Sequence, residues 1–341
     1  MNNITDISTL GEFGLIKHIT KDFDVKNKST IKAVGDDAAV LNFTDKEIVV
    51  TTDLLIENIH FDLTYVPLKH LGYKSVIVNL SDVYAMNAQA RQITVSIAIS
   101  SRFPVEAVDE LYKGIKLACD TYGVDLIGGD TTSSKTGLMI SVTAIGEIEK
   151  GKAVYRNTAK SRELICVSGD LGAAYAGLQV LEREKQVFKD NPEIQPELDK
   201  YGYVLERQLK PEARADIVRL LAELKITPTS MIDISDGLSS EILHICDQSN
   251  VGCKIFEEKI PIANETRNFS DELMIDATTF AMNGGEDYEL LFTISQKDFE
   301  KLDGNPDISI IGHLTEKEEG NFLIAKDGTP VKIQAQGWTH Q

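Results

Sequence analysis

The sequence predicts a two-domain protein of the α/β to α+β class, with strands and helices in both halves. Short β-prone runs alternate with stretches that carry apolar residues at helical spacing, and this alternation continues through the whole chain. The chain has 341 residues, which exceeds the usual size of one domain and is enough to bury two cores. We therefore expect domains over residues 1–150 and 151–341.

The first half combines three kinds of local signal. β-prone runs indicate strands, apolar residues at helical spacing indicate helices, and a proline is tolerated in the first turn of a helix. In order, we expect a strand at 47–52, a helix at 68–87, a strand at 93–99, a helix from Pro104 to Tyr122, and strands at 125–127 and 138–148.

The second half repeats the strand-turn-helix pattern. The charged, proline-containing stretch 185–200 is typical of a solvated excursion. We expect a strand at 163–168 followed by an Ala-rich helix, a helix at 211–224, a strand at 230–234, a helix from about 237 to 249, and strands at 254–256, 289–294 and 308–311.

Composition limits the function and the compartment. Lys and Arg number 35 against 53 acids, and this charge of −18 argues against nonspecific binding to nucleic acid or anionic membranes. No apolar run approaches about 18 residues, and the N-terminus lacks the pattern of a signal peptide, so we expect a cytoplasmic protein. The four cysteines form no CxxC pair and are predicted to be reduced and buried.

Aspartates flanked by Gly, Ser or Thr recur along most of the chain. Most of these motifs follow an apolar, β-prone run, where carboxylates at strand ends can converge on one crevice and glycine lets the backbone approach a ligand. The motifs are Val34-Gly35-Asp36-Asp37, Thr51-Thr52-Asp53, Asn79-Leu80-Ser81-Asp82, Gly128-Gly129-Asp130-Thr131-Thr132 and Ile232-Asp233-Ile234-Ser235-Asp236-Gly237.

Gathered in one crevice, these carboxylates would repel one another unless cations were bound. Two like charges about 4 Å apart cost roughly 4 kcal/mol at an effective dielectric constant of about 20. Mg²⁺ takes oxygen ligands and usually combines a few carboxylates with water and substrate phosphates. The sequence therefore predicts a phosphate site that holds several magnesium ions.

Each motif alone is also compatible with an ordinary turn or helix cap. Their number favours a site, and the motif from Asp233 to Gly237 is the strongest, because it brings two carboxylates and a hydroxyl to one strand-to-helix turn whose helix N-terminus favours a phosphate. The sequence contains no P-loop, protein-kinase or zincin motif. Gly169 to Gly172 is half of a dinucleotide fingerprint, and a tight turn is its favoured interpretation.

Three further features are open to two interpretations. His60 follows the Asp53 motif and either meets a substrate or is an ordinary surface histidine. The run Asn283 to Glu289, with two glycines and three acids before a strand, is either a tight turn or a substrate clamp. Trp338, the only tryptophan, lies three residues from the C-terminus, which favours a surface or lid role.

Together, the motifs resemble those of the thiamine-monophosphate kinases, members of the aminoimidazole-ribonucleotide-synthetase-like superfamily of ATP-binding enzymes. The resemblance runs nearly end to end. It covers Gly11-Glu12-Phe13, Gly35-Asp36-Asp37, Thr52-Asp53, Val78 to Asp82, Leu126 to Thr132, Asp233 to Leu238 and Gly284 to Leu290, whereas Glu206 to Pro211 departs from a more His/Arg-rich version.

The resemblance implies an N-terminal mixed-sheet domain that pairs in a homodimer, a C-terminal α+β domain, and sites for ATP and several Mg²⁺ between them. It implies direct in-line phosphorylation of thiamine monophosphate to thiamine diphosphate. Asp82, Asp130 and Asp233 would be catalytic. Magnesium would be held by Asp36, Thr51, Thr52, Asp53, Asp82, Asp130, Asp233 and Asp236, the nucleotide by Tyr122, Gly129, Asp130, Arg156 and Ser235, and the thiamine end by His60, Glu286 and Trp338.

Two other functions stay open from the sequence. Another ATP-using enzyme of the superfamily, such as aminoimidazole ribonucleotide synthetase, is the main alternative, and a noncatalytic sensor of thiamine phosphates or nucleotides is the second. Selenophosphate synthetase needs a reactive cysteine or selenocysteine in its N-terminal segment, but the first cysteine here is Cys119. The hydrogenase-maturation dehydratase presents a C-terminal cysteine, but this sequence does not end in cysteine.

Overall fold

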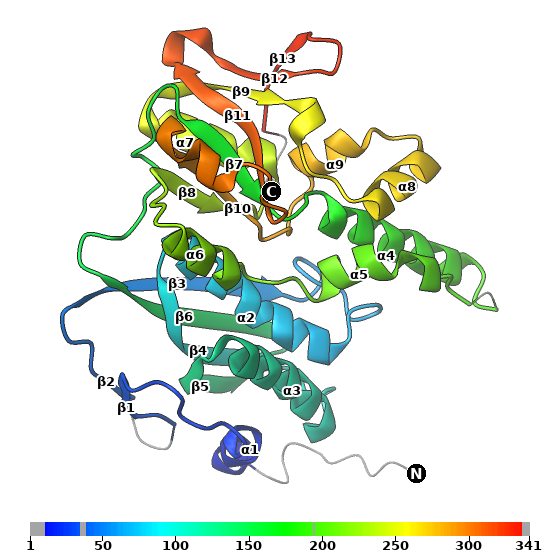
Figure 1. Ribbon diagram of the computed structural model, residues 1–341. Coiled ribbons are helices and arrows are strands. Elements are labelled where there is room, and N and C mark those ends of the chain that lie inside the picture. Colours follow the sequence, from blue (N-terminus) through cyan, green and yellow to red (C-terminus); the bar gives the residue numbers. More distant parts are fainter. Residues whose placement is uncertain (1–10, 35–38, 194, 336–341) are drawn as a thin grey trace. The chain divides into compact units, whose positions relative to one another are not determined.

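The computed structural model describes residues 11–34, 39–193 and 195–335, and the chain forms two compact units (Figure 1). The N-terminal unit comprises Met1–Val83 and Ala88–Lys152, and the C-terminal unit comprises Tyr84–Asn87 and Ala153–Gln341. Among the described residues, no helix is both long and apolar enough to pass through a bilayer. The four cysteines are buried and free, which confirms the sequence prediction.

The N-terminal unit is built on a four-stranded mixed sheet in the order β3-β6-β4-β5. β6 pairs antiparallel with β3 and β4, whereas β4 and β5 are parallel. The strands are β3 (Lys46–Ile56), β4 (Gln89–Ile99), β5 (Asp125–Ser133) and β6 (Met139–Glu149), accompanied by α1 (Gly11–Thr20), β1 (Thr30–Lys32), β2 (Val40–Leu41), α2 (Leu68–Ala85) and α3 (Val105–Tyr122).

One face of this sheet is packed, and the other is partly exposed. Along β6, residues from Ile140 to Ile148 alternate between buried and partly exposed, as expected when only one face is packed. On the edge strand β3 the alternation leaves Ile48, Val50 and Leu54 exposed at 41%, 61% and 50%. The uncovered face therefore carries an apolar stripe at its β3 edge.

Helices α2 and α3 meet backbone to backbone at two glycines. A Cβ atom on Gly72 would lie 2.0 Å from the carbonyl oxygen of Leu111, and a Cβ atom on Gly114 would lie 1.9 Å from the carbonyl oxygen of Lys69. Glycine inside a helix costs about 1 kcal/mol relative to alanine. Only glycine allows this approach, which fixes α2 against α3.

The C-terminal unit contains a seven-stranded sheet in the order β13-β12-β9-β11-β7-β10-β8. Its neighbours pair antiparallel except for β12 with β9. The strands are β7 (Leu164–Ser168), β8 (Ser230–Asp233), β9 (Val251–Phe256), β10 (Leu290–Ile294), β11 (Ile308–Glu316), β12 (Asn321–Ile324) and β13 (Pro330–Lys332), and the helices are α4 (Ala173–Asp190), α5 (Gly202–Leu209), α6 (Ala215–Glu223), α7 (Leu238–Ser249), α8 (Asn264–Leu273), α9 (Ala277–Asn283) and α10 (Phe299–Leu302).

Two apolar clusters stabilise this unit. The larger one packs the sheet against α7, with Ile242 and Ile245 fully buried beside residues of β7 and β10. The smaller one joins α4, α5, α8 and α9 around Phe269 and Phe280, each 1% exposed. The first cluster holds β8 and the start of α7 in place.

The structure confirms the fold class and corrects some local predictions. The prediction that most aspartate motifs end a strand is wrong for two of them, because Asp53 lies within β3 and Asp130 within β5. Asp82 lies within α2, inside the helix expected at 68–87. Asp233 does end β8. The helix expected at 211–224 begins only at Ala215, and α4 extends to Asp190, into the stretch expected to be an excursion.

The glycine contact leads to a stability prediction. Gly72→Ala and Gly114→Ala should each lower the free energy of unfolding by roughly 1–3 kcal/mol, because the new methyl group enters the backbone of the other helix. Urea unfolding measures the change. Gly202→Ala is the control, because a Cβ atom there meets nothing within 4 Å. Equal stability of the Gly72 and Gly202 variants would contradict the proposed packing.

Candidate active site

The N-terminal unit brings together three of the predicted metal ligands. Thr51 and Asp53 are two residues apart on β3, so their side chains lie on the same face of the strand. The Thr51 hydroxyl donates a hydrogen bond to the Asp82 carboxylate of α2, with an oxygen-to-oxygen distance of 2.6 Å. A strand and a helix thus place two carboxylates and a hydroxyl beside one another.

Asn79 fixes the position of Asp53. It lies one turn before Asp82 on α2 and is fully buried. Its Oδ1 accepts the backbone N–H of Asp53 at 3.0 Å, and its Nδ2 donates to the Ser75 carbonyl at 3.1 Å. Because β3 is an edge strand, this side chain takes the place of a neighbouring strand at Asp53.

The surroundings of Asp53 disfavour its ionised form. Burial, and then the nearby Asp82 carboxylate, raise the pKa of Asp53 from 3.8 to about 6. A divalent cation would favour both ionised carboxylates, and one or two carboxylates with water and phosphate are typical of a Mg²⁺ site. Thr51, Asp53 and Asp82 therefore fit part of a magnesium site.

The remaining predicted residues of this unit are more dispersed. Asp130 is exposed, and the strand register puts it in one row with Ser96 and Leu54, which belong to the sheet face opposite Asp53. Thr52 donates to the Val142 carbonyl at 3.0 Å. His60 is exposed, and its Nδ1 accepts the backbone N–H of Ile56. Tyr122 is the last residue of α3. Gly129 is exposed on β5.

No group of three acidic, histidine or cysteine side chains that could by itself hold a metal ion occurs in the described part of the chain. Asp36 and Trp338 lie outside the described residues. Of the predicted metal ligands, the structure brings Thr51, Asp53 and Asp82 together in the N-terminal unit.

In the C-terminal unit, two predicted motifs pack against each other. The turn from Asp233 to Gly237 connects β8 to α7, and the loop from Gly284 to Tyr288 leads into β10. The backbone N–H of Glu286 donates to the Ser235 carbonyl at 2.8 Å. A Cβ atom on Gly285 would lie 2.3 Å from that same oxygen, so a glycine is required at this contact.

Glu286 projects from this loop in an uncommon backbone conformation, with φ at +67°. Its carboxylate accepts a hydrogen bond from Gln208 of α5 at 2.8 Å. Gln208 is 6% exposed, so the Glu286 carboxylate is held from the protein side. This arrangement is compatible with the predicted substrate clamp.

The loop is anchored by buried charges that the protein itself neutralises. Glu289 is 1% exposed and forms ion pairs with Arg207, at 2.7 Å, and with Arg214. The Arg207 and Arg214 side chains are 15% and 11% exposed. Removal of either arginine would leave buried negative charge, which is strongly destabilising.

Asp287 anchors the loop to the start of α4. Its carboxylate accepts the backbone N–H groups of Gly172 at 2.7 Å and Ala174 at 3.2 Å. Burial raises the pKa of Asp287 to about 7, although Arg207 and the two N–H groups favour the ionised form. The turn at Gly169 to Gly172 therefore receives a carboxylate of the protein, in agreement with its interpretation as a structural turn.

Glu241, in the first turn of α7, lies beneath the Asp233–Gly237 turn. Its Oε1 accepts the backbone N–H of Asp236 at 3.2 Å. The residue is 1% exposed, and its Oε2 has no hydrogen-bond partner among the described residues. Burial, and to a smaller extent the charges of Asp236 and Asp233, raise the pKa of Glu241 to about 8.

Arg156, a predicted nucleotide contact, lies at the other end of α7. Its carbonyl oxygen accepts a hydrogen bond from Ser249, the last residue of that helix, at 3.0 Å. A helix of 12 residues is about 18 Å long. The backbone of Arg156 is thus a helix length from the turn that carries Ser235.

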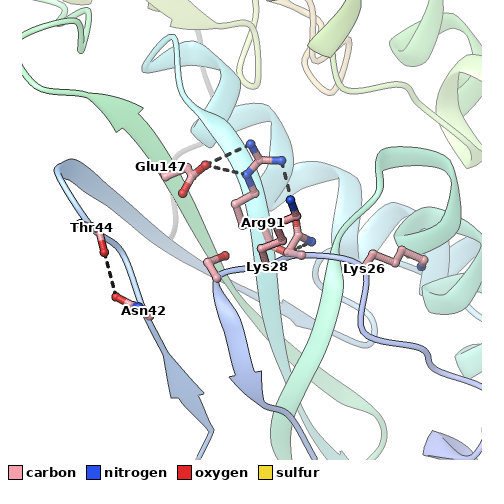
Figure 2. A pocket seen from close by; sticks show the side chains of 8 residues that line it. Lys26, Lys28, Asn42, Thr44, Arg91 and Glu147 are labelled. Atoms are coloured by element: carbon pink, nitrogen blue, oxygen red, sulfur yellow. Dashed lines mark hydrogen bonds and ion pairs between the residues drawn. The ribbon is translucent and has the colours of Figure 1, made fainter.

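A polar pocket of about 440 Å³ lies elsewhere in the N-terminal unit (Figure 2). Arg91 and Lys26 line it, but Arg91 is paired with Glu147 at 3.0 Å and Lys26 with Asp120 at 2.7 Å. These pairs reduce the positive charge offered to an anion. The pocket contains none of the predicted site residues and is not the candidate active site.

The fold and the acidic motifs define a class of protein that known families share. Residues 35–148 match the family described as AIR synthase related protein, N-terminal domain, and residues 163–324 match its C-terminal domain. The chain is therefore an AIR synthase related protein with both domains in the expected order.

Individual similar proteins assign the chain to one family within this class. The thiamine-monophosphate kinase of Bacillus subtilis is 33% identical, over 97% of this chain and 99% of its own length, and that of Aquifex aeolicus is 35% identical over 98% and 99%. The solved structure of AaThiL complexed with AMPPCP and TMP matches with a TM-score of 0.76 and 33% identity, over 98% of each chain. This chain belongs to the thiamine-monophosphate kinase family.

Several residues of the site were not singled out from the sequence. Asn79 stood inside a quoted motif without a role, and Gln208 stood in the segment that departs from the family pattern. For Glu241 the sequence does contain a signal. A glutamate near the start of a predicted helix often accepts a hydrogen bond from the backbone N–H groups at the helix N-terminus.

The raised pKa of Asp53 predicts a pH-dependent stability in metal-free protein. The folded state holds this proton more tightly than the unfolded state, so the contribution of Asp53 to the free energy of unfolding falls as pH rises from about 4 to about 6. The wild-type protein should lose on the order of 1 kcal/mol of its free energy of unfolding over this pH range, after allowance for partial exposure. The Asp53→Asn protein should not show this loss.

Urea unfolding in the presence of a chelator, at pH 4 and pH 7, measures this effect. Asp45→Asn is the control, because the Asp45 side chain is 88% exposed. An Asp53→Asn protein with the same pH dependence as the wild type would show that the shift in pKa is absent.

Proposed function

We propose that this protein transfers the γ-phosphate of ATP directly to the phosphate of thiamine monophosphate, which gives thiamine diphosphate. The observation that carries the proposal is the match over 98% of both chains to AaThiL complexed with AMPPCP and TMP. The relatives named thiamine-monophosphate kinase support it over nearly their whole length. We place the enzyme in the cytoplasm, in thiamine diphosphate biosynthesis.

The acceptor in this reaction is already a phosphate oxyanion, so no general base is needed. Catalysis then consists of positioning the two substrates and neutralising the charge of the transferred group. Bound Mg²⁺ would supply that neutralisation. The residues that would hold Mg²⁺ are Thr51, Thr52, Asp53, Asp82 and Asp130 in the N-terminal unit, Asp233 and Asp236 in the C-terminal unit, and Asp36, which lies outside the described residues.

The substrate contacts are proposed on the same basis. Tyr122, Gly129, Asp130, Arg156 and Ser235 would meet the nucleotide. His60, Glu286 and Trp338 would meet the thiamine end, where a carboxylate and aromatic rings suit a cationic thiazolium. Gln208 holds the Glu286 carboxylate at 2.8 Å, which supports a defined contact at this position.

The function is tested by the formation of ADP and thiamine diphosphate from ATP and thiamine monophosphate, with Mg²⁺ and with a chelator. We expect turnover only with Mg²⁺ and none with formylglycinamidine ribonucleotide as the second substrate. Asp82→Asn and Asp233→Asn should each lower kcat at least about 100-fold, because each removes a charge that binds a cation. Asp45→Asn should retain full activity.

Other outcomes would assign another function. Turnover with formylglycinamidine ribonucleotide alone would identify an aminoimidazole ribonucleotide synthetase. Tight ATP binding without ADP formation from any phosphorylated thiamine would identify a sensor. An Asp82→Asn protein that keeps most of its kcat at saturating Mg²⁺ would contradict the role of Asp82.

We further propose that the apolar stripe Ile48, Val50 and Leu54 binds a second copy of the chain. These side chains are 41% to 61% exposed on the open face at the edge strand β3. An edge strand with exposed apolar residues favours association unless it is covered. The stripe thus supports a homodimer formed through the N-terminal unit.

Charge placed on the stripe should therefore dissociate the dimer. A Val50→Asp and Leu54→Asp double variant should elute as a monomer in size-exclusion chromatography with light scattering, whereas the wild type elutes as a dimer. Val331→Asp, at a residue 49% exposed on β13, is the control and should remain dimeric. A wild-type monomer, or a dimeric double variant, would refute this interface.

A further inference from the structure

The peptide group between Ser235 and Asp236 is held from both sides. Its carbonyl oxygen, which belongs to Ser235, accepts the N–H of Glu286 at 2.8 Å. Its N–H, which belongs to Asp236, donates to Oε1 of Glu241 at 3.2 Å. Because a peptide group is planar, these two hydrogen bonds fix the orientation of the whole unit.

This peptide lies in the middle of the motif that carries Asp233, Ser235 and Asp236. Its orientation sets the backbone directions from which the Ser235 and Asp236 side chains leave. The turn also has an uncommon conformation, since Gly237 has a φ of +117°. A turn of this kind keeps its geometry only when neighbouring groups determine it.

Stability alone does not account for a glutamate at position 241. The residue is 1% exposed, and its Oε2 lacks a hydrogen-bond partner among the described residues, which costs free energy. Asp233 and Asp236, both acids, lie nearby and disfavour ionisation of Glu241. A serine or asparagine at the N-cap would satisfy the helix N-terminus without burying a carboxyl group.

We propose that Glu241 is a positioning residue, which holds the Ser235–Asp236 peptide and thereby aims the Ser235 and Asp236 side chains at magnesium and nucleotide. The proposal rests on the proposed function for the identity of the ligand. It adds a residue that touches neither substrate but determines how the nucleotide side of the site binds.

Binding of Mg²⁺ with the nonhydrolysable analogue AMPPCP, measured by calorimetry, tests the proposal without turnover. Glu241→Ala should raise the Kd at least about 10-fold, because the Asp236 N–H loses its acceptor. Glu241→Gln keeps an oxygen in the same place and should bind within about 3-fold of the wild type. In the kinetic assay, Glu241→Ala should raise the KM for ATP and lower kcat.

Two further variants separate positioning from stability. Glu163→Ala is the matched control, because Glu163 is also buried in the C-terminal unit, 8% exposed, and also accepts a backbone N–H, that of Lys160 at 2.8 Å. It should lower the melting temperature and leave the Kd unchanged. Glu241→Asp shortens the side chain and should weaken binding even if Glu241→Ala does not fold.

Normal AMPPCP binding by Glu241→Ala or Glu241→Asp would overturn the proposal, as would an equal loss in Glu241→Gln and Glu241→Ala. The binding measurement does not use thiamine monophosphate. A wild-type protein that binds Mg²⁺ and AMPPCP but does not phosphorylate thiamine monophosphate would refute the proposed function and leave the role of Glu241 intact. A wild-type protein that binds no nucleotide would refute both.

Discussion

In each unit, a buried side-chain oxygen that accepts the backbone N–H of an aspartate underlies the candidate site. Asn79 accepts the N–H of Asp53, and Glu241 accepts that of Asp236. An aspartate side chain is short, so its carboxylate can be placed accurately only if its own backbone is fixed. The hydrogen bonds to the backbone therefore determine the position of the charges, and the packing of α2 and α7 determines the position of Asn79 and Glu241.

The charge balance distinguishes the acids that support the fold from those that are suited to bind a ligand. Glu289 is buried between Arg207 and Arg214, so the protein itself neutralises it. Burial and the neighbouring Asp82 carboxylate instead raise the pKa of Asp53 to about 6. An acid whose ionised form is disfavoured by burial and by a second carboxylate gains from a bound cation. This difference fits a chain with a charge of −18 that handles phosphate substrates.

The sequence predicted the fold class and the strongest motif because both depend on local patterns. β8 and α7 follow from an apolar run and a turn, and Asp233 to Gly237 follows from residue type. Helices α5, α8 and α9 were missed because much of their support comes from packing around Phe269 and Phe280. Asn79 could not be given a role because it binds a backbone group 26 residues away, whose position depends on the fold. Glu241 binds a backbone group only 5 residues away, so its local signal was available in the sequence.

The strand-end prediction failed for a related physical reason. A carboxylate can enter a site from the middle of an edge strand, where the backbone N–H groups lack a neighbouring strand and a helix side chain can bind them, as Asn79 does at Asp53. It can also enter from a helix, as Asp82 does beside Thr51. Residue type and flanking glycines therefore indicate which acids belong to a site, whereas the supporting hydrogen bonds decide where along an element such an acid can lie.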